Sequence, residues 1–316
     1  MSGSKWIVND IVCRDSRYLT DFIKPESVAL TITSPPYRNA IDYDTHIANN
    51  KQRYRGKCIW GTNESDTKEY LKIMKSIFDQ VYEVTIPGGY CCIVIGYEVV
   101  KGEIIPLPSL LLAKLLSDRK KKWKLREEII WNKVTAGRNG VGNRFSVTAK
   151  SLKSKTTHFL NYYANIMHEY IFVLSKGDTK VRINKEDTLQ RIMKLKLHPY
   201  VYRELANSVW NIAPVPPRSI DHPCPFPEQI PWRLIQLYSN PNDVVLDPMN
   251  GSGQTTKVAK YLNRQFIGVD KIEKYVELAK KRLDEPPNLS TLLWIEKWGS
   301  MDTSTWKEQS LEKYSC

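Results

Sequence analysis

The chain has 316 residues, of which 41% are apolar and 26% charged, and a formal net charge of +13. This composition excludes a disordered chain, and the length allows one large domain or a catalytic domain with an accessory one. The six cysteines form no CxxC pair and no zinc-ligand spacing, so we expect reduced thiols, no disulfide scaffold and no metal. The basic excess makes a polyanionic partner worth testing.

The sequence contains no segment that predicts membrane insertion or export. The N-terminal MSGSKWIVND lacks a charged region followed by an apolar stretch, and the most apolar windows, 90–100 and 109–116, are too short to cross a bilayer. We therefore expect a soluble, cytoplasmic protein that has no membrane partner.

Predicted strands and helices alternate along the chain. A period-two pattern predicts a strand at 27–33, which the prolines after Ser34 end. Helical spacing begins after the capping pair Asp66 and Glu69 and stops at Pro87. Further strands are predicted at 90–96, 128–132, 170–175, 244–247 and 266–270, and further helices at 107–116, 228–239, 255–262 and 272–283. This order predicts an α/β fold with a doubly wound, mostly parallel sheet.

Two segments interrupt the alternation. From residue 119 to 158 the chain carries twelve basic and two acidic residues, which is most of the net charge. A solvated helix end explains the run 119–124, whereas 134–157 is rich in Gly, Ser and Thr and predicts a long basic loop. The second segment, 177–220, is polar and contains four prolines, which predicts an insertion or a small subdomain.

A glycine-containing turn follows the predicted strand at 244–247. The strand ends in Asp247, the turn reads Pro-Met-Asn-Gly-Ser-Gly, and a helix starts near Thr255. The next strand also ends in an acid, Asp270, from which a carboxylate can accept hydrogen bonds from ribose hydroxyls. Such a pair suits a dinucleotide or S-adenosylmethionine. Thr256 stands where the dinucleotide fingerprint requires a third glycine, which disfavours nicotinamide or flavin.

The pentapeptide Thr33-Ser34-Pro35-Pro36-Tyr37 suits the recognition of a planar amino group. Consecutive prolines have no N–H to offer and leave nearby carbonyls free to accept hydrogen bonds from an exocyclic NH₂. The ring of Tyr37 provides a face on which a base can stack. Taken alone, the same residues would also fit a Pro-Pro turn after an edge strand.

Together, the two motifs closely resemble those of the amino-group DNA methyltransferases of type II restriction–modification systems. The order matches the permuted class, in which the catalytic motif precedes the cofactor motif, and the resemblance covers most of the chain. It implies a methyltransferase sheet, S-adenosyl-L-methionine as cofactor, double-stranded DNA as substrate and a cognate restriction endonuclease as functional partner in a bacterial or archaeal cell.

The resemblance also assigns residues. It implies a catalytic segment of Ser34, Pro35, Pro36 and Tyr37, and a cofactor site of Asp15, Thr33, Phe226, Asp247, Pro248, Met249, Gly251, Ser252, Gly253 and Asp270. Met249 departs from the usual Phe and Gln254 from a common Thr. Because Met is large, apolar and adaptable, we expect the first change to be tolerated; the second has no evident consequence.

DNA recognition is expected outside the sheet. We expect phosphate contacts from Arg138, Arg144, Lys150, Lys153 and Lys155. The expected parts are the catalytic sheet at 1–133, 167–176 and 221–290, the basic loop at 134–166, a target-recognition segment at 177–220 and a C-terminal extension at 291–316.

The nature of the methylated atom follows from the family pattern. A serine before the two prolines is more typical of enzymes that methylate N4 of cytosine, whereas Asp or Asn is more typical of N6-adenine enzymes. We therefore expect N4-cytosine methylation, with N6-adenine as the alternative. A non-catalytic DNA-binding protein of this fold and a methyltransferase acting on RNA or protein are the remaining alternatives. The sequence leaves the recognition sequence and the oligomeric state open.

Overall fold

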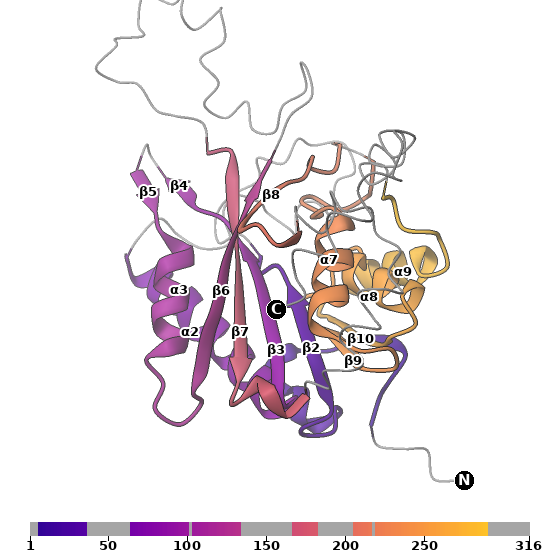
Figure 1. Cartoon of the computed structure of the whole chain (residues 1–316). Coiled ribbons are helices and arrows are strands. Elements are labelled where there is room, and N and C mark those ends of the chain that lie inside the picture. The colour runs from indigo at the N-terminus through magenta and orange to yellow at the C-terminus, as the bar shows by residue number, and fades with distance from the viewer. Residues whose placement is uncertain are drawn as a thin grey trace, which may run out of the picture.

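A computed structural model describes residues 6–36, 64–100, 103–133, 166–182, 205–216 and 219–289. Its centre is an eight-stranded sheet in the order β1–β10–β9–β2–β3–β7–β6–β8 (Figure 1). Within this sheet β7 alone runs antiparallel to its neighbours. The strands are β1 (Asp10–Cys13), β10 (Gln265–Asp270), β9 (Val244–Asp247), β2 (Val28–Thr33), β3 (Thr85–Ile95), β7 (His168–Lys176), β6 (Trp123–Asn132) and β8 (Val209–Asn211).

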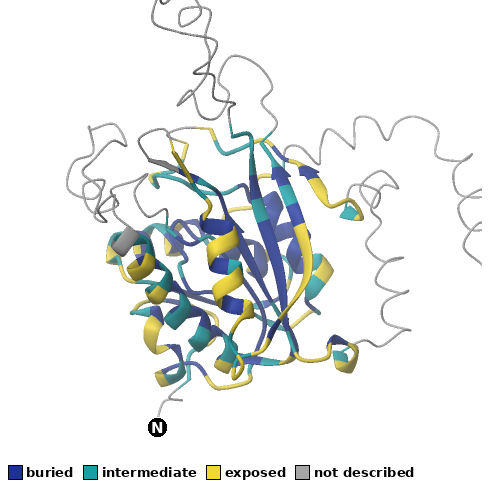
Figure 2. Cartoon of the chain, turned by 90° about the vertical axis from the view of Figure 1, so that its left-hand side faces the viewer, coloured by how far each residue is buried: buried dark blue, intermediate teal, exposed yellow. Residues whose placement is uncertain are grey.

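Helices cover both faces of the sheet, which confirms the predicted doubly wound arrangement (Figure 1). One face carries η1 (Ser16–Asp21), α2 (Glu64–Val84) and α3 (Leu107–Leu116), and the other carries α7 (Gln229–Tyr238), α8 (Gln254–Tyr261) and α9 (Glu273–Arg282). Along β3, Cys91 and Ile93 face the first group while Cys92 and Val94 face the second, so this strand is buried on both sides. The central strands of the sheet carry the colour of buried residues over much of their length (Figure 2).

The structure places the starts of two strands, β3 and β6, earlier in the chain than predicted. The Pro87-Gly88-Gly89 stretch, predicted as a break before a strand, lies inside β3, where the register with β2 shifts between the pairs Val28–Thr85 and Leu30–Tyr90. Gly88 has φ +74, and a Cβ there would lie 2.7 Å from a Val181 methyl, so this irregularity requires glycine. The second moved boundary is the start of β6, at Trp123 rather than near residue 128.

Several short elements have no periodicity signal. Strands β1 and β8 span four and three residues, and β4 (Glu98–Val100) and β5 (Glu103–Ile105) form a separate hairpin. A 3₁₀ turn, η3 (Thr179–Arg182), packs on β3. Strand β8 lies within the segment 177–220, and it pairs in parallel with the end of β6. Among the described residues, none of the helices combines the length and the hydropathy of a transmembrane segment.

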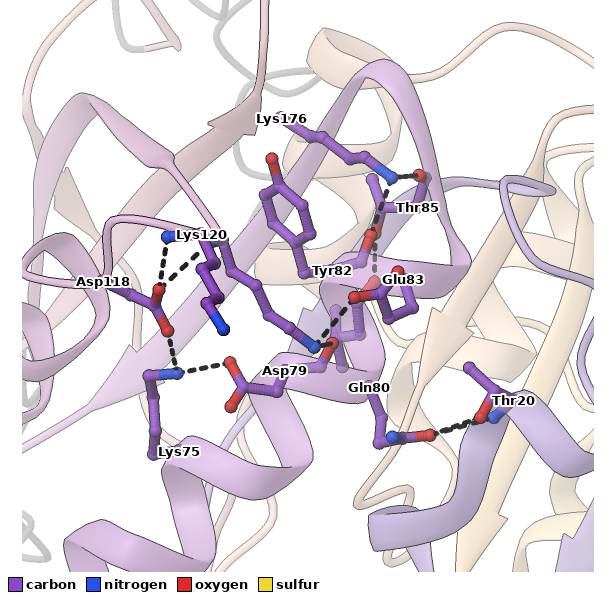
Figure 3. A network of polar contacts seen from close by, with 12 residues as sticks. Thr20, Lys75, Asp79, Gln80, Tyr82, Glu83, Thr85, Asp118, Lys120 and Lys176 are labelled. Carbon is purple, nitrogen blue, oxygen red and sulfur yellow. Dashed lines mark hydrogen bonds and ion pairs between the residues drawn. The ribbon is translucent and has the colours of Figure 1, made fainter.

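An ionic network holds the edge of the sheet where β2 and β6 begin (Figure 3). Lys75 of α2 pairs with Asp79 at 2.5 Å and with Asp118 at 2.6 Å. Lys121 pairs with Glu83 at 2.8 Å. The basic run 119–124 therefore covers the partly solvated turn between α3 and β6 and the first two residues of β6, at the edge opposite to the end of β2, and part of its charge is already paired.

Candidate active site

The carboxyl ends of β1, β10, β9 and β2 lie side by side along one edge of the sheet. The residues that follow these strands therefore gather there: Asp15 after β1, Asp270 at the end of β10, the loop 248–253 after β9 and Ser34 after β2. Parallel α/β sheets bind ligands outside this edge. The topology thus brings together the two motifs that lie far apart in the sequence.

Backbone hydrogen bonds fold the loop 248–253, which we call the cofactor loop, back over β10. Asn250 N donates to Val269 O at 2.9 Å, and Gly251 N donates to Asp270 Oδ2 at 2.8 Å. Gly251 and Gly253 have φ +47 and +81, a conformation that side chains other than glycine rarely adopt. The two glycines are thus required by the turn itself.

Asp270 organises the loop and still has capacity to bind a ligand. Its second oxygen, Oδ1, accepts from Ile272 N at 3.0 Å. Burial raises the pKa of this carboxyl, and the backbone donors offset part of the shift by stabilising the charged form. Because two carboxylate oxygens have about four acceptor positions between them, Asp270 can also accept from a ribose hydroxyl.

Asp247 is almost completely buried beneath the cofactor loop, with 1% of its surface exposed. Its Oδ1 accepts from Met249 N at 3.1 Å. Burial raises the pKa of this carboxyl to about 7, and the charge of Asp270 adds to the shift, although Thr33, Met249 and Thr255 favour the ionised form. A nearby cation would therefore favour the ionised form of Asp247 near neutral pH.

The predicted catalytic segment leaves β2 directly beside the cofactor loop. Thr255 Oγ1, in the first turn of α8, donates to Ile32 O at 3.2 Å, which ties the two motifs together. Ser34 and Pro36 are half-buried and Pro35 is buried. Tyr37 lies outside the described residues, so its predicted stacking role stays a prediction.

Asp15 has a different environment from the other two acids. It caps η1, where its carboxylate accepts from Arg17 N at 2.9 Å, and the hydrogen bonds to the Arg17 guanidinium lower its pKa. The neighbouring Ser16 hydroxyl donates to Pro248 O, which fastens η1 to the cofactor loop. Asp15 thus lies near the loop, and its charge is already paired with an arginine.

The structure adds residues that the sequence reasoning missed. A Cβ on Gly268 would lie 2.9 Å from Cγ of Asn250, so this strand glycine makes room for the amide beneath the loop. The His222 ring covers Gly251, with Nε2 only 2.7 Å from where a Cβ would be. Glycine inside a strand is a general signal of close approach, and it would have pointed to Gly268. No sequence signal pairs His222 with Gly251.

These residues fit S-adenosyl-L-methionine. The glycines let a ligand approach the backbone, Asp270 offers acceptors to a ribose, and the buried Asp247 favours a cationic group nearby. Phe226 is half-buried and packs against the cluster formed by α7, α8 and their strands. Ser252 is buried in the loop itself. In the part of the chain that the structure describes, no cluster of His, Cys, Asp or Glu could hold a metal.

The five predicted DNA-contacting residues, Arg138, Arg144, Lys150, Lys153 and Lys155, lie outside the described residues. The chain on either side of them is described. Lys133 N donates to Met167 O at 2.8 Å, and Lys133 forms an ion pair with Glu169. The end of β6 and the start of β7 lie on the same edge as the end of β2 (Figure 1). The basic loop therefore leaves the sheet at the edge that carries Ser34.

Comparisons with known proteins agree with this geometry. A family model described as DNA methylase matches residues 28–281. The type II methyltransferase M.MjaI of Methanocaldococcus jannaschii is 28% identical over 86% of this chain and 92% of its own length. M.ScaI of Streptomyces caespitosus is 26% identical over 85% of this chain and 79% of its own length.

Solved structures share the fold. TTHA0409 of Thermus thermophilus, solved in complex with S-adenosyl-L-methionine, has a TM-score of 0.62 at 23% identity and covers 87% of this chain and 93% of its own. The PvuII DNA methyltransferase, named as cytosine-N4-specific, has a TM-score of 0.59 at 17% identity over 92% and 93% of the two chains. The chain belongs to the DNA methylase family, the S-adenosyl-L-methionine-dependent amino-group methyltransferases of restriction–modification systems.

Proposed function

We propose that this DNA methyltransferase modifies the exocyclic N4 of cytosine in duplex DNA. The observation that carries the proposal is the placement of Ser34-Pro35-Pro36 at the carboxyl end of β2, next to the cofactor loop. A hydroxyl rather than a carboxylate or amide at position 34 favours cytosine within the family pattern. N6 of adenine is the alternative acceptor.

The chain's own groups act by positioning and by accepting hydrogen bonds. The amine lone pair of cytosine is delocalised into the ring. Hydrogen bonds from the amino group to the Ser34 hydroxyl and to a carbonyl of Ser34 or Pro35 favour a pyramidal nitrogen and stabilise the positive charge that develops there. The prolines present no competing N–H. The nitrogen needs no strong base before transfer, and its proton leaves through the Ser34 hydroxyl, which passes on its own proton, or directly to water.

The bound cofactor supplies an electrophilic methyl group on a sulfonium. Asp270 and the cofactor loop would hold it next to Ser34, since β9, which the cofactor loop follows, lies between β10 and β2. Because both reactants are then held in one site with the acceptor nitrogen aligned on that methyl group, the bimolecular displacement becomes an effectively unimolecular step. The target base must leave the helix to reach this edge, and stacking on Tyr37 would hold the extruded base.

DNA binding would use the basic loop, which leaves the same edge, and the segment 177–220, which follows the end of β7 at the opposite edge and reaches the end of β6 through β8. The five cations of the basic loop suit contacts with phosphates, which position the duplex without reading its sequence. The segment 177–220 would contribute base recognition, and its residues 209–211 anchor it to β6 as β8. A cognate endonuclease that cleaves the unmethylated site would complete the restriction–modification pair.

The two ends of β2 offer a matched test of the catalytic assignment. Ser34→Ala removes the hydroxyl at the carboxyl end, and we expect methyl transfer to DNA to fall by about 10²–10³-fold. Ser27→Ala removes a hydroxyl just before the amino end, where Ser27 Oγ donates to Lys24 O at 2.6 Å, and we expect unchanged transfer. The measurement is labelled methyl incorporation into duplex DNA. Full activity of the Ser34 variant would make the assignment wrong.

A further inference from the structure

A buried ionic cluster lies behind the cofactor loop, on α7, α8 and α9. Glu228 Oε1 accepts from Arg282 Nη2 at 2.8 Å and pairs with Lys257 Nζ at 2.9 Å. Glu228 and Lys257 are almost fully buried, and Arg282 is buried as well. Burying three charges is costly unless each has partners, so such a cluster fixes the positions of all three elements.

The cluster reaches the cofactor loop through Arg282. Its Nη1 donates to Gln254 Oε1 at 2.7 Å and also to Ser252 O. Gln254 Nε2 donates in turn to Phe226 O at 2.8 Å. One guanidinium therefore holds the loop directly, and through a single amide it also holds the segment that carries Phe226.

Gln254 uses its amide in a way that a threonine would not reproduce. The Oε1 acceptor faces Arg282 and the Nε2 donor faces Phe226, so both halves of the amide are engaged. A threonine has a single hydroxyl on a shorter side chain and cannot span both partners. The glutamine at this position therefore has a structural reason in this chain: it couples Phe226 to Arg282.

We propose that Arg282 and Gln254 are positioning residues that set the affinity for S-adenosyl-L-methionine. They hold the Ser252–Gly253 peptide and the Phe226 backbone in fixed relation, so the site is formed before the cofactor arrives. Pre-organisation of this kind acts on binding, because ordering that is already complete in the free protein does not oppose association. The inference rests on the proposed placement of the cofactor on the loop.

The test compares cofactor affinity with stability. Gln254→Met keeps the length of the side chain and removes both hydrogen bonds. We expect its dissociation constant for S-adenosyl-L-methionine, measured by calorimetry, to rise about tenfold. We expect kcat at saturating cofactor to stay within about twofold of the wild type, because the lost interactions stabilise the bound cofactor equally in the ground state and in the transition state. Arg282→Met should weaken binding at least as much, and Arg282→Lys less, since lysine keeps the charge but lacks the fork.

The controls separate this inference from the site assignment. Lys75→Met, in the network at the opposite edge, should leave cofactor affinity unchanged. Gly251→Val should abolish cofactor binding; if it does not, the proposed cofactor site itself is wrong. If Gly251→Val abolishes binding but Gln254→Met lowers only the melting temperature and leaves the dissociation constant at the wild-type value, the positioning role is overturned. Gln254→Met preserves this test even where Arg282→Met fails to fold.

Discussion

Two ionic networks stabilise opposite edges of the same sheet, and they differ in burial. In the network behind the cofactor loop, the side chains of Glu228 and Lys257 are each 4% exposed. In the network at the amino edge, Lys75 is 16% and Asp118 21% exposed (Figure 3). Water can replace the partners of the second network far more readily than those of the first. Similar ion pairs therefore fix the cofactor loop at one edge, whereas at the other edge they contribute little to the stability of the turn between α3 and β6.

The difference in burial also distinguishes basic residues that hold the structure together from basic residues that only add net charge. Lys257 and Arg282 are inward-facing cations that hold backbone and acids in place. The run 119–124 lies in the turn before β6 and at the start of that strand, at the amino edge and away from the site, and it adds net charge without adding a contact to Ser34. The charge relevant to DNA should therefore be that of the loop 134–166, which leaves the sheet at the carboxyl edge.

The largest expected effect on stability is the loss of the buried acid. Glu228→Ala removes the buried acid that pairs with Arg282 and Lys257 and leaves them only the longer pairs with the exposed Glu285, so we expect it to lower the free energy of unfolding by about 3–5 kcal/mol. The comparison change at the other edge is Lys75→Met, which should lower the free energy of unfolding by no more than about 1 kcal/mol. Denaturant titration of both variants measures the contrast. Equal losses would remove the distinction between the networks.

A second prediction concerns pH and has opposite signs for binding and for folding. Because the pKa of Asp247 is raised to about 7, the residue loses its charge as pH falls below that value. Affinity for the cationic cofactor should then weaken, by up to about tenfold per pH unit below 7. The fold behaves in the reverse way: the neutral form is favoured in the folded state, so this stabilising contribution is complete below about pH 4 and is lost as pH rises through 7.

Asp247→Asn tests both signs at once. The amide cannot titrate, so the slope of cofactor affinity between pH 6 and 8 should flatten. The melting temperature of the cofactor-free variant should likewise become less dependent on pH in the range from about 4 to 7. Calorimetry and thermal melts over this range measure the two effects. A variant that keeps the wild-type slopes would show that another group is responsible.

The smallest expected effect concerns the basic loop, and it sharpens the comparison between the cations of that loop and those of the run 119–124. Replacing Arg144, Lys150 and Lys153 by glutamine should weaken DNA binding to all sequences and reduce the slope of log affinity against log salt by up to about 2–3. The same change at Arg119, Lys120 and Lys122 should leave that slope nearly unchanged. Binding titrations at several salt concentrations give both slopes. An altered sequence preference alone would mean that the loop reads bases.

Much of the fold and the core of the site followed from local sequence patterns. The strand ending in Asp247, the glycine turn and the acid Asp270 are each encoded within a few residues, and the parallel order of the strands places them together. The strand β1 and the strand β8 escaped prediction because they are too short for periodicity to show. The edge of the sheet at which the run 119–124 lies could not be predicted, because it depends on the direction of β6, and only the pairing of the strands gives that direction.

The role of Gln254 could not be predicted for a different reason. Its two partners, Phe226 and Arg282, each lie 28 residues away in opposite directions along the chain. No periodicity or motif connects positions at that distance. A glutamine in place of the common threonine does not by itself indicate which residues it contacts. The packing of α8 against α9 and against the segment before α7 is what creates the contact.

The most direct test of the central claim is the identity of the methylated nucleoside. Duplex DNA treated with the enzyme and S-adenosyl-L-methionine is digested to nucleosides and analysed by mass spectrometry, with Ser34→Ala and Ser27→Ala in parallel. We expect N4-methylcytosine with the wild type and with Ser27→Ala, and a loss of about 10²–10³-fold in its rate of formation with Ser34→Ala. N6-methyladenine as the only product would contradict the proposed acceptor.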